Sequence, residues 1–408
     1  MMAGNADIAP RADLFAPPAI PPEGREQAAK LLQSGRLHRY SEAGATAESE
    51  AAALEREMAA LAGTPYAVAL NSCGSALFLA LKGLGVAPGD PVLISGFTLA
   101  PVPGAILHAD AKPVPVEITE DLVIDLDDLA AKTRESGAKV LMVSHMRGHV
   151  CDLPRLMALC ERLGVRVIED GAHALGASWD GRAAGSYGDV GAFSFQSGKH
   201  VNAGEGGVLV TADEDIAARA ILHSGSYMLH AQNGARPPDA VMARWAGACA
   251  NFSLRMPELT AAIARPQLPL LAARAADWNA THDALLARLA TMDGVHLPHR
   301  PPEEGYVQSS LQFRLPADAP GVIADFVARC RAGGVFVKWF GAEAAEGYTS
   351  APRHWPGGTG GPAPGTHRIL ASLCDLRLPL GMSGAEIDWL AGTLNDSLAA
   401  ARKAQVRS

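Results

Sequence analysis

Apolar and polar residues alternate along the first two thirds of the chain in two different periods. Six short apolar runs, several of them rich in valine and isoleucine, have the length and composition of β-strands. They span residues 66–70, 91–95, 139–145, 165–170, 189–195 and 207–211. Segments between them place apolar residues three or four positions apart; in one of these, Asp152 can cap a helix and Gly164 can end it. Strands separated by such helices predict βαβ units, and therefore an α/β fold with a mostly parallel sheet covered by helices on both faces.

The pattern changes after about residue 270. A long, Ala-rich segment at 272–290 predicts a helix, a shorter strand-like run follows at 311–315, and residues 384–404 have the pattern of a C-terminal helix. These elements predict a smaller α+β domain. We therefore expect an extended, proline-rich N-terminal arm, a large domain and a small C-terminal domain, with boundaries at residues 1–29, 30–270 and 271–408.

Composition and charge exclude several classes of protein. Of the 408 residues 48% are apolar, but no run approaches the roughly 18 apolar residues of a membrane helix. The formal net charge is −8 and no basic block is present, so neither nucleic acid nor an anionic membrane is an expected partner. The six cysteines form no CxxC pair, so we expect neither a metal site nor a disulfide framework. The start lacks the basic-then-apolar order of a signal peptide, and we expect a cytoplasmic enzyme or binding protein.

The stretch "NSCGSALFLA" (71–80) carries the first candidate chemistry. A predicted strand leads into a polar turn, and a helix begins near Ser72 or Cys73. The backbone N–H groups of a helix start bind phosphate well; Gly74 lets the backbone approach, and Ser75 adds a hydroxyl donor. Taken alone, this stretch is explained better by ordinary helix capping, since Ser and Gly are common at helix starts.

The second stretch, "VIEDGAHALGA" (167–177), ends an apolar strand with two carboxylates. Glu169 and Asp170 must point to opposite sides of the sheet, so one faces the mouth where parallel sheets bind ligands. A carboxylate there can hold a proton on a ring nitrogen and keep the ring a good electron sink. A capping aspartate on a strand-to-loop turn is the alternative.

The third stretch, "FSFQSGKHVNAGEGG" (193–207), places Lys199 between a strand and four nearby glycines. A lysine amine forms a Schiff base with an aldehyde when its pKa is depressed or a base lies nearby. Ser194 adds a hydroxyl, and the glycines allow tight turns. A phosphate cradle, a carboxylate and a Schiff-base lysine are together what pyridoxal 5'-phosphate (PLP) requires.

The order and spacing of these motifs resemble the DegT/DnrJ/EryC1/StrS aminotransferases, a family of fold-type I PLP enzymes related to aspartate aminotransferase. The similarity rests on "NSCGSAL", on residues 168–207, on "NFSLRMPELTAAIARPQL" (251–268) and on "LRLPLGMSGAEIDWL" (376–390). It implies an aminotransferase that uses glutamate or glutamine to aminate a ketone or aldehyde of a sugar- or cyclitol-like acceptor. It also implies a homodimer whose subunits share active sites.

The resemblance assigns roles to individual residues. Lys199 matches the Schiff-base lysine that also shuttles a proton, and Asp170 matches the aspartate at the pyridinium nitrogen. The remaining matches are Gly74, Ser75 and Ser194 at the phosphate, His173 near the ring hydroxyl where the family usually has glutamine, and Asn251, which reaches the phosphate of the neighbouring subunit.

Several positions depart from the family pattern. Leu99 stands where an aromatic residue usually stacks on the cofactor ring, which leaves His173 or Phe97 to stack instead. "HMRG" replaces the commoner "HLYG", so that Arg147 takes the place of a tyrosine. The candidates for binding a donor carboxylate are Arg147, Arg244 and Arg255.

Three other readings remain open at this point. The first is a different PLP reaction on the same fold: decarboxylation, dehydration or oxidation of an amino compound. The second, a nucleotide-binding oxidoreductase, needs G-x-G-x-x-G after a strand, and "NAGEGG" does not fit that spacing. The third is a PLP-dependent regulator, which would need a DNA-binding module.

Overall fold

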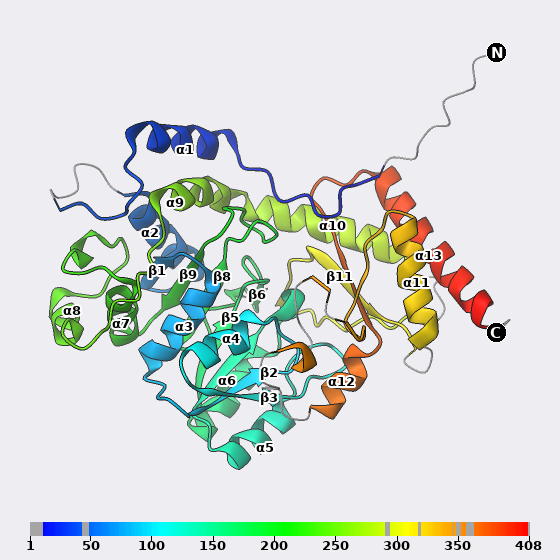
Figure 1. Cartoon of the computed structure of the whole chain (residues 1–408), viewed down its shortest axis with the longest axis horizontal. Coiled ribbons are helices and arrows are strands. Elements are labelled where there is room, and N and C mark those ends of the chain that lie inside the picture. Colours follow the sequence, from blue (N-terminus) through cyan, green and yellow to red (C-terminus); the bar gives the residue numbers. More distant parts are fainter. Residues whose placement is uncertain are drawn as a thin grey trace.

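The structure is a computed structural model that describes residues 11–42, 49–289, 294–316, 320–344, 346–347, 352–355 and 363–406. Residues 1–10 of the expected arm lie outside this part of the chain. Residues 11–21 run from the C-terminal elements across the molecule to α1 (Pro22–Ser34), as Figure 1 shows. The last part of the expected arm is therefore helical, and α1 ends at Gly35 in the left-handed conformation (φ 69°).

A seven-stranded sheet, counted over the described residues, forms the centre of the molecule, in the order β1-β9-β8-β5-β4-β2-β3. The strands are β1 (Tyr66–Leu70), β2 (Pro91–Ser95), β3 (Lys112–Val116), β4 (Val140–Ser144), β5 (Arg166–Asp170), β8 (Val190–Ser194) and β9 (Gly207–Thr211). All neighbours are parallel except β9, which runs antiparallel to both β1 and β8. The predicted fold class and the six predicted strands are confirmed. The sequence pattern did not predict β3, because its two prolines interrupt the run; they are tolerated at the sheet edge.

Helices cover both faces of this sheet. Side chains of α3 (Cys73–Leu84), α4 (Pro101–His108), α7 (Glu214–Ser224) and α8 (Asp239–Trp245) pack with Ile94, Met142 and Ile168 on one face. Alternate strand residues such as Leu141, Val167 and Val208 point to the other face. That face is covered by α2 (Glu50–Ala62), α5 (Leu126–Ser136), α6 (Leu153–Leu163) and α9 (Glu258–Ala264).

The C-terminal elements build a second, smaller layer. Strands β11 (Ser310–Arg314), β13 (Leu373–Arg377) and β12 (Lys338–Trp339) pair antiparallel in that order. Helices α10 (Leu271–Leu289), α11 (Pro320–Ala332), α12 (Pro364–Leu370) and α13 (Gly384–Gln405) surround them, on the right of Figure 1. Their apolar side chains share one core with the central sheet, in which Phe313 and Leu141 both take part. The boundaries at residues 30 and 271 stay a prediction.

Short elements connect the two layers. A small sheet joins β10 (Glu304–Gly305), β6 (Ser178–Trp179) and β7 (Arg182–Ala183). Short 3₁₀ segments lie at η1 (Met146–Gly148), η2 (His230–Gln232), η3 (Arg265–Leu270) and η4 (Pro352–His354). Helix α10 follows η3 directly, so the chain enters its C-terminal part along a continuous helical path. None of the helices in the described ranges is long and apolar enough to cross a membrane.

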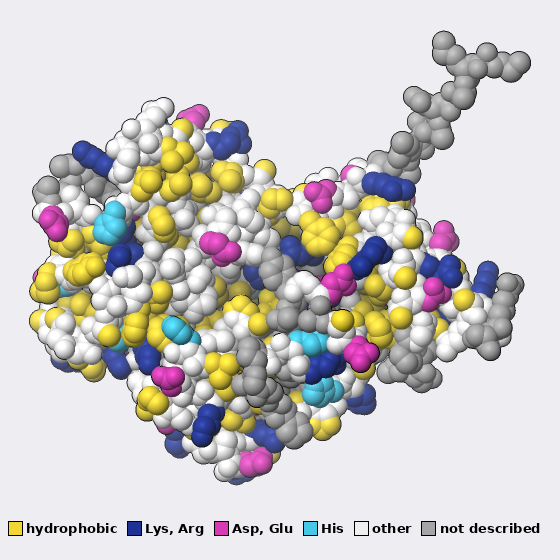
Figure 2. Space-filling model, in the orientation of Figure 1, with side chains coloured by type: hydrophobic (Ala, Val, Ile, Leu, Met, Phe, Trp, Pro, Cys, Tyr) yellow, Lys and Arg dark blue, Asp and Glu magenta, His cyan; other side chains and the backbone are white. Residues whose placement is uncertain are grey.

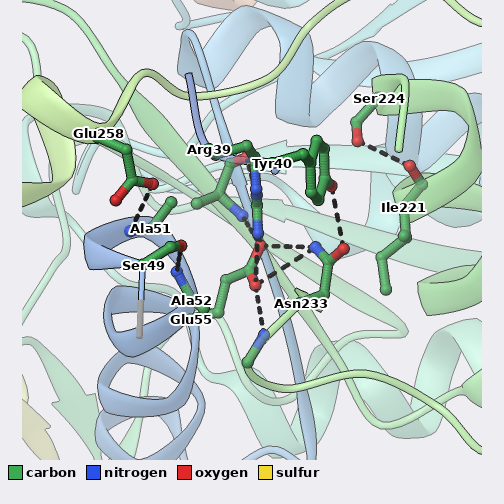
Figure 3. Close-up of polar contacts among 12 residues, drawn as sticks. Arg39, Tyr40, Ser49, Ala51, Ala52, Glu55, Ile221, Ser224, Asn233 and Glu258 are labelled. Carbon is green, nitrogen blue, oxygen red and sulfur yellow. Dashed lines mark hydrogen bonds and ion pairs between the residues drawn. The ribbon is translucent and has the colours of Figure 1, made fainter. Parts of the chain in front are cut away.

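A buried ion pair joins segments that are far apart in the sequence (Figure 3). Arg39 donates to both carboxylate oxygens of Glu55 on α2, at 2.8 and 2.9 Å, and both side chains are fully buried. Glu55 also accepts hydrogen bonds from the backbone of Ala69 and Gly234 and from the Asn233 amide. One carboxylate thus holds α2, β1 and the 233–234 loop together.

Candidate active site

A cavity of about 490 Å³ lies beside the carboxyl ends of β4, β5 and β8. This is the edge at which parallel sheets bind ligands. The cavity brings together Gly74, Asp170, His173, Ser194 and Lys199 from three separate sequence motifs. Its other lining residues include Ser72, Cys73, Leu99, Met146, Arg147, Gln196, Glu205 and Arg377.

Lys199 lies in the turn after β8, with its amine inside the cavity. Its Nζ is 2.6 Å from Nε2 of His173. Burial lowers the pKa of Lys199 to about 7, helped by the positive charge of Arg147 and opposed by the carboxylate of Asp170. Burial and the nearby Lys199 hold the pKa of His173 well below its usual value. At neutral pH a large share of Lys199 is therefore the free amine that attacks an aldehyde.

The two carboxylates at the end of β5 have different surroundings. Asp170 lines the cavity and accepts hydrogen bonds from the Ser144 hydroxyl (2.9 Å) and the Ala172 amide (3.1 Å). Glu169 is fully buried on the opposite side, where His145 and backbone N–H groups surround it. The predicted division is confirmed: Asp170 faces the cavity, and Glu169 fastens the 185–188 loop to the sheet.

The start of α3 has the geometry of an anion site. Ser72 is the N-cap and accepts from the Ser75 amide at 3.0 Å, which leaves the N–H groups of Cys73 and Gly74 without an intrahelical acceptor. Ser194, at the end of β8, is buried beside them and its Oγ lies 3.3 Å from the Gln196 amide. The Ser75 hydroxyl instead donates to Asn71 Oδ1 at 2.6 Å, and Ser75 is not among the lining residues. In this conformation the structure does not bring Ser75 to the cavity.

Asn251 lies outside the cavity of its own chain. It is exposed on the loop before α9, and its Oδ1 accepts from the amide of Ser253 at 2.9 Å. Its expected role was toward a neighbouring subunit, and the exposed position is compatible with that role. Within one chain, however, Asn251 is a surface residue.

The three residues considered for stacking on the cofactor ring, Leu99, Phe97 and His173, differ in whether they line the cavity. Leu99 lines the cavity, so an aliphatic side chain occupies the position of the usual aromatic residue. Phe97 is 1% exposed and packs edge-on against Phe340, with ring centroids 5.1 Å apart. The structure does not place Phe97 in the cavity lining, because its ring is buried in an apolar cluster that reaches the cavity only through Met146 and Leu99 among the described residues. His173 does line the cavity.

Only one of the three expected carboxylate-binding arginines reaches the site. Arg147 lines the cavity and pairs with Asp375 at 2.6 Å. Arg244 is exposed and pairs with Asp215 at 2.9 Å, while Arg255 donates to the carbonyl of Gly225 at 3.0 Å away from the cavity. Arg377 also lines the cavity and was missed. The sequence does contain a sign of Arg377, because this charged residue ends the strand-like run "LCDLR". Site residues often lie at the ends of strands.

The residues present fit PLP. The cavity has the volume of a small-molecule site, and its lining supplies an amine, a carboxylate at the strand end and free helix N–H groups. These are the groups that an aldehyde, a pyridine nitrogen and a phosphate need. The fold and site therefore define the class, a PLP-dependent transferase with a mostly parallel central sheet.

Comparisons with known proteins narrow the class. The family model described as the DegT/DnrJ/EryC1/StrS aminotransferase family matches residues 23–393. A UDP-N-acetyl-3-dehydro-alpha-D-glucosamine 3-aminotransferase from Acidithiobacillus ferrooxidans is 34% identical, over 65% of this chain and 68% of its own length. The spore coat polysaccharide biosynthesis protein SpsC of Bacillus subtilis is 38% identical, and the match spans about half of each chain (50% and 51%). The crystal structure of the aminotransferase TlmJ from Streptoalloteichus hindustanus superimposes with a TM-score of 0.80 at 25% identity, covering 95% of this chain and 98% of TlmJ.

The chain belongs to the DegT/DnrJ/EryC1/StrS aminotransferase family. PLP is the cofactor of that family, and the recognition made from the sequence motifs is confirmed.

Proposed function

We propose that this enzyme transfers an amino group from glutamate or glutamine to a ketone or aldehyde of a polar, sugar- or cyclitol-like acceptor. The observation that carries the proposal is the meeting of Lys199, with its pKa of about 7, and Asp170 in one cavity. The acceptor class follows the relative from Acidithiobacillus, whose name describes amination of a nucleotide sugar. Only small-molecule substrates are proposed, and we place the reaction in the cytoplasm.

The chain's own residues divide the work. PLP, when bound, supplies an electron sink for a negative charge at the carbon that bears the amino group. Lys199 holds the cofactor and moves a proton to and from that carbon, since its amine is neutral for a large part of the time at pH 7. Asp170, held by Ser144, keeps a proton on the ring nitrogen. Gly74, Ser194 and the start of α3, which line the cavity, would hold the phosphate, and His173 would lie at the ring hydroxyl.

We further propose that the active unit is a homodimer with shared sites. Exposed apolar side chains support this, since Tyr227 (59% exposed) and Met228 (75%) lie on the loop after α7, and Phe252 directly follows Asn251. Apolar side chains also gather on the part of the surface where α1, α8 and α9 lie (Figures 1 and 2). Such an exposed surface is typical of a subunit interface. Asn251 would then act on the cofactor phosphate of the partner subunit.

The test is an absorbance spectrum of the PLP-loaded protein before and after addition of glutamate or glutamine. The wild type is expected to show a cofactor band that shifts to the amine form with one donor. Lys199→Ala is expected to lose the covalent link, whereas Lys132→Ala, at a partly exposed lysine on α5, is expected to match the wild type. A wild type without a cofactor band would contradict the proposal. A band that no amino donor changes would point to decarboxylation, dehydration or oxidation instead.

A further inference from the structure

Two arginines from distant parts of the chain meet beside Lys199. Arg147 follows β4 in the central sheet, and Arg377 ends β13 in the C-terminal sheet. Both line the cavity that contains Lys199, and both line a smaller adjoining cavity with His173 and Ser309. After burial, the positive charges of the two arginines are among the causes that lower the pKa of Lys199. Both guanidinium groups therefore lie within electrostatic reach of the reacting amine.

Arg147 is held in place by a buried chain of polar side chains. Its Nη2 pairs with Asp375 Oδ2 at 2.6 Å, and Asp375 Oδ1 accepts from Gln312 Nε2 at 2.7 Å. Gln312 Oε1 in turn lies 2.9 Å from His149 Nε2. The Gln312 amide nitrogen already donates to Ser310 and Asp375, so its oxygen accepts and His149 donates.

The four side chains in this hydrogen-bonded series, Arg147 to His149, are only 2–8% exposed. Charged and polar residues are usually far more exposed. Burial and the positive charge of Arg300 hold the pKa of His149 well below its usual value, so the ring stays neutral. Arg147 also has a left-handed backbone conformation (φ 57°), which a non-glycine residue adopts only when its surroundings hold it there. Its Nε is buried and, over the described residues, lacks a hydrogen-bond partner.

Arg377 is positioned by the glycine that precedes Lys199. A Cβ atom on Gly198 would lie 2.5 Å from Arg377 Nη1, so the guanidinium packs directly on the Gly198 backbone. The ring of Phe15, from the N-terminal arm, also lies near the guanidinium, with 5.9 Å between Cζ and the ring centroid. Lys338, opposite Asp375 in the sheet, adds a third cation to this region. Burial lowers the pKa of Lys338 to about 8, helped by the charges of Arg147 and Arg377 and opposed by the carboxylate of Asp375.

We propose that Arg147 and Arg377 form a subsite that binds a substrate carboxylate next to the reacting carbon, and that Asp375, Gln312 and His149 are positioning residues for Arg147. The inference rests on the proposed function, because a carboxylate at this place matters to the reaction when Lys199 carries the cofactor. Guanidinium groups bind carboxylates with strong, oriented hydrogen bonds. The carboxylate belongs to the amino acid donor or to an acidic acceptor.

The first experiment measures steady-state kinetics with glutamate and calorimetric binding of maleate, a dicarboxylate without an amino group, to the PLP-loaded protein. Arg377→Met is expected to raise both KM for glutamate and Kd for maleate by about tenfold to a hundredfold, while kcat changes little. Arg377→Lys is expected to recover part of this loss. Arg244→Met, at an exposed arginine on α8, is expected to match the wild type. Unchanged KM and Kd in Arg377→Met would overturn the subsite.

A second experiment tests whether Asp375, Gln312 and His149 position Arg147 or only stabilise the fold. Gln312→Leu removes the link between Asp375 and His149 but leaves the cavity lining intact. It is expected to raise KM for glutamate and Kd for maleate several-fold, with unchanged PLP content and kcat. A variant that loses PLP and thermal stability while maleate affinity stays the same would show a merely structural role and overturn the positioning role.

Measuring the two half-reactions separately shows which substrate, the donor or the acceptor, carries the carboxylate that binds to this subsite. If Arg377→Met slows only the conversion of bound PLP by glutamate, the subsite binds the carboxylate of the donor. If the variant also slows the return reaction with a carboxylate-bearing ketone but not with a neutral cyclitol ketone, both substrates use the subsite; either result supports it. Maleate binding distinguishes the two proposals, because a wild type that binds maleate but transfers no amino group refutes the proposed function and leaves the subsite standing.

Discussion

At the scale of single residues, the glycines around Lys199 are explained by close packing. A Cβ atom on Gly207 would collide with the backbone of Ser72 and Cys73, so the start of β9 lies directly against the start of α3. Gly198 leaves room for the Arg377 guanidinium. These two glycines therefore bring a strand, a helix start and an arginine close to one lysine.

Gly207→Ala is expected to lower the free energy of unfolding by about 1–3 kcal/mol, because the new methyl group meets rigid backbone. It should also weaken PLP binding, since it displaces the helix start. Urea unfolding and PLP titration measure the two effects. The matched control is Gly247→Ala, where nothing within 4 Å of the new Cβ was found. Equal stability of both variants would contradict the packing explanation.

The lowered pKa of Lys199 predicts how PLP incorporation depends on pH. Because the amine must be neutral to attack, the rate should rise with pH, level off above about 7, and fall about tenfold for each unit below it. The measurement is the absorbance change when PLP is added to apoprotein between pH 5.5 and 9. A rate that keeps rising to pH 10 would show an ordinary, unshifted lysine.

At the scale of secondary-structure elements, buried carboxylates fasten loops to helices and strands. Glu169 holds the 185–188 loop against β5, and Glu55 holds β1 and the 233–234 loop against α2. Each accepts several hydrogen bonds, which a buried charge requires. Arg39 supplies the countercharge to Glu55. The sequence pattern could not reveal this pair, because its members are 16 positions apart.

Arg39→Met is expected to cost about 3–5 kcal/mol of unfolding free energy, because it leaves the Glu55 charge buried without its cation. Lys132→Met removes one partner of an exposed pair on α5 and should change stability by less than about 0.5 kcal/mol. Urea denaturation of the two variants tests the contrast. Comparable losses would contradict the expected difference between a buried and a solvent-facing ion pair.

At the scale of the whole molecule, the cavity draws on both layers. Asp170, His173 and Lys199 come from the central sheet, while Arg377 and the Asp375 that holds Arg147 come from the C-terminal sheet. The N-terminal arm crosses the junction, where Asn202 and Arg274 donate to the carbonyls of Pro18 and Ala19. One apolar core runs through both layers. We therefore expect this shared core to fix the position of one layer, and its half of the cavity, relative to the other.

The proposed homodimer has its own test. Met228→Asp places a charge on the exposed apolar loop and is expected to yield monomers with weakened PLP binding, because each site would lose the partner's contribution. Light scattering after size exclusion gives the mass. Val406→Asp, at an exposed position beyond α13, is the control and should leave the mass unchanged. A wild type with the mass of one chain would refute the dimer.

The strands and most site residues could be predicted because they depend on short stretches of chain. β1, β2 and β9 have the predicted bounds, and α3 begins after Ser72 as expected. Asp170 and Lys199 were found because a strand end or a turn sets their direction locally. The structure does not bring Phe97 or the Ser75 hydroxyl to the cavity, for one reason: the backbone does not decide which way a side chain turns once neighbours compete for it. Phe340 and Asn71 are those neighbours.

The sequence by itself determined the α/β fold, the family and the lysine–aspartate pair, because periodicity and motif spacing are local properties of the chain. Only the tertiary structure decided which arginines reach the cavity. Arg147 and Arg377 are 230 residues apart, and Asp375, Gln312 and His149 meet through strand pairing and buried hydrogen bonds. Contacts of that kind depend on how separate layers pack, and no single stretch of sequence contains them.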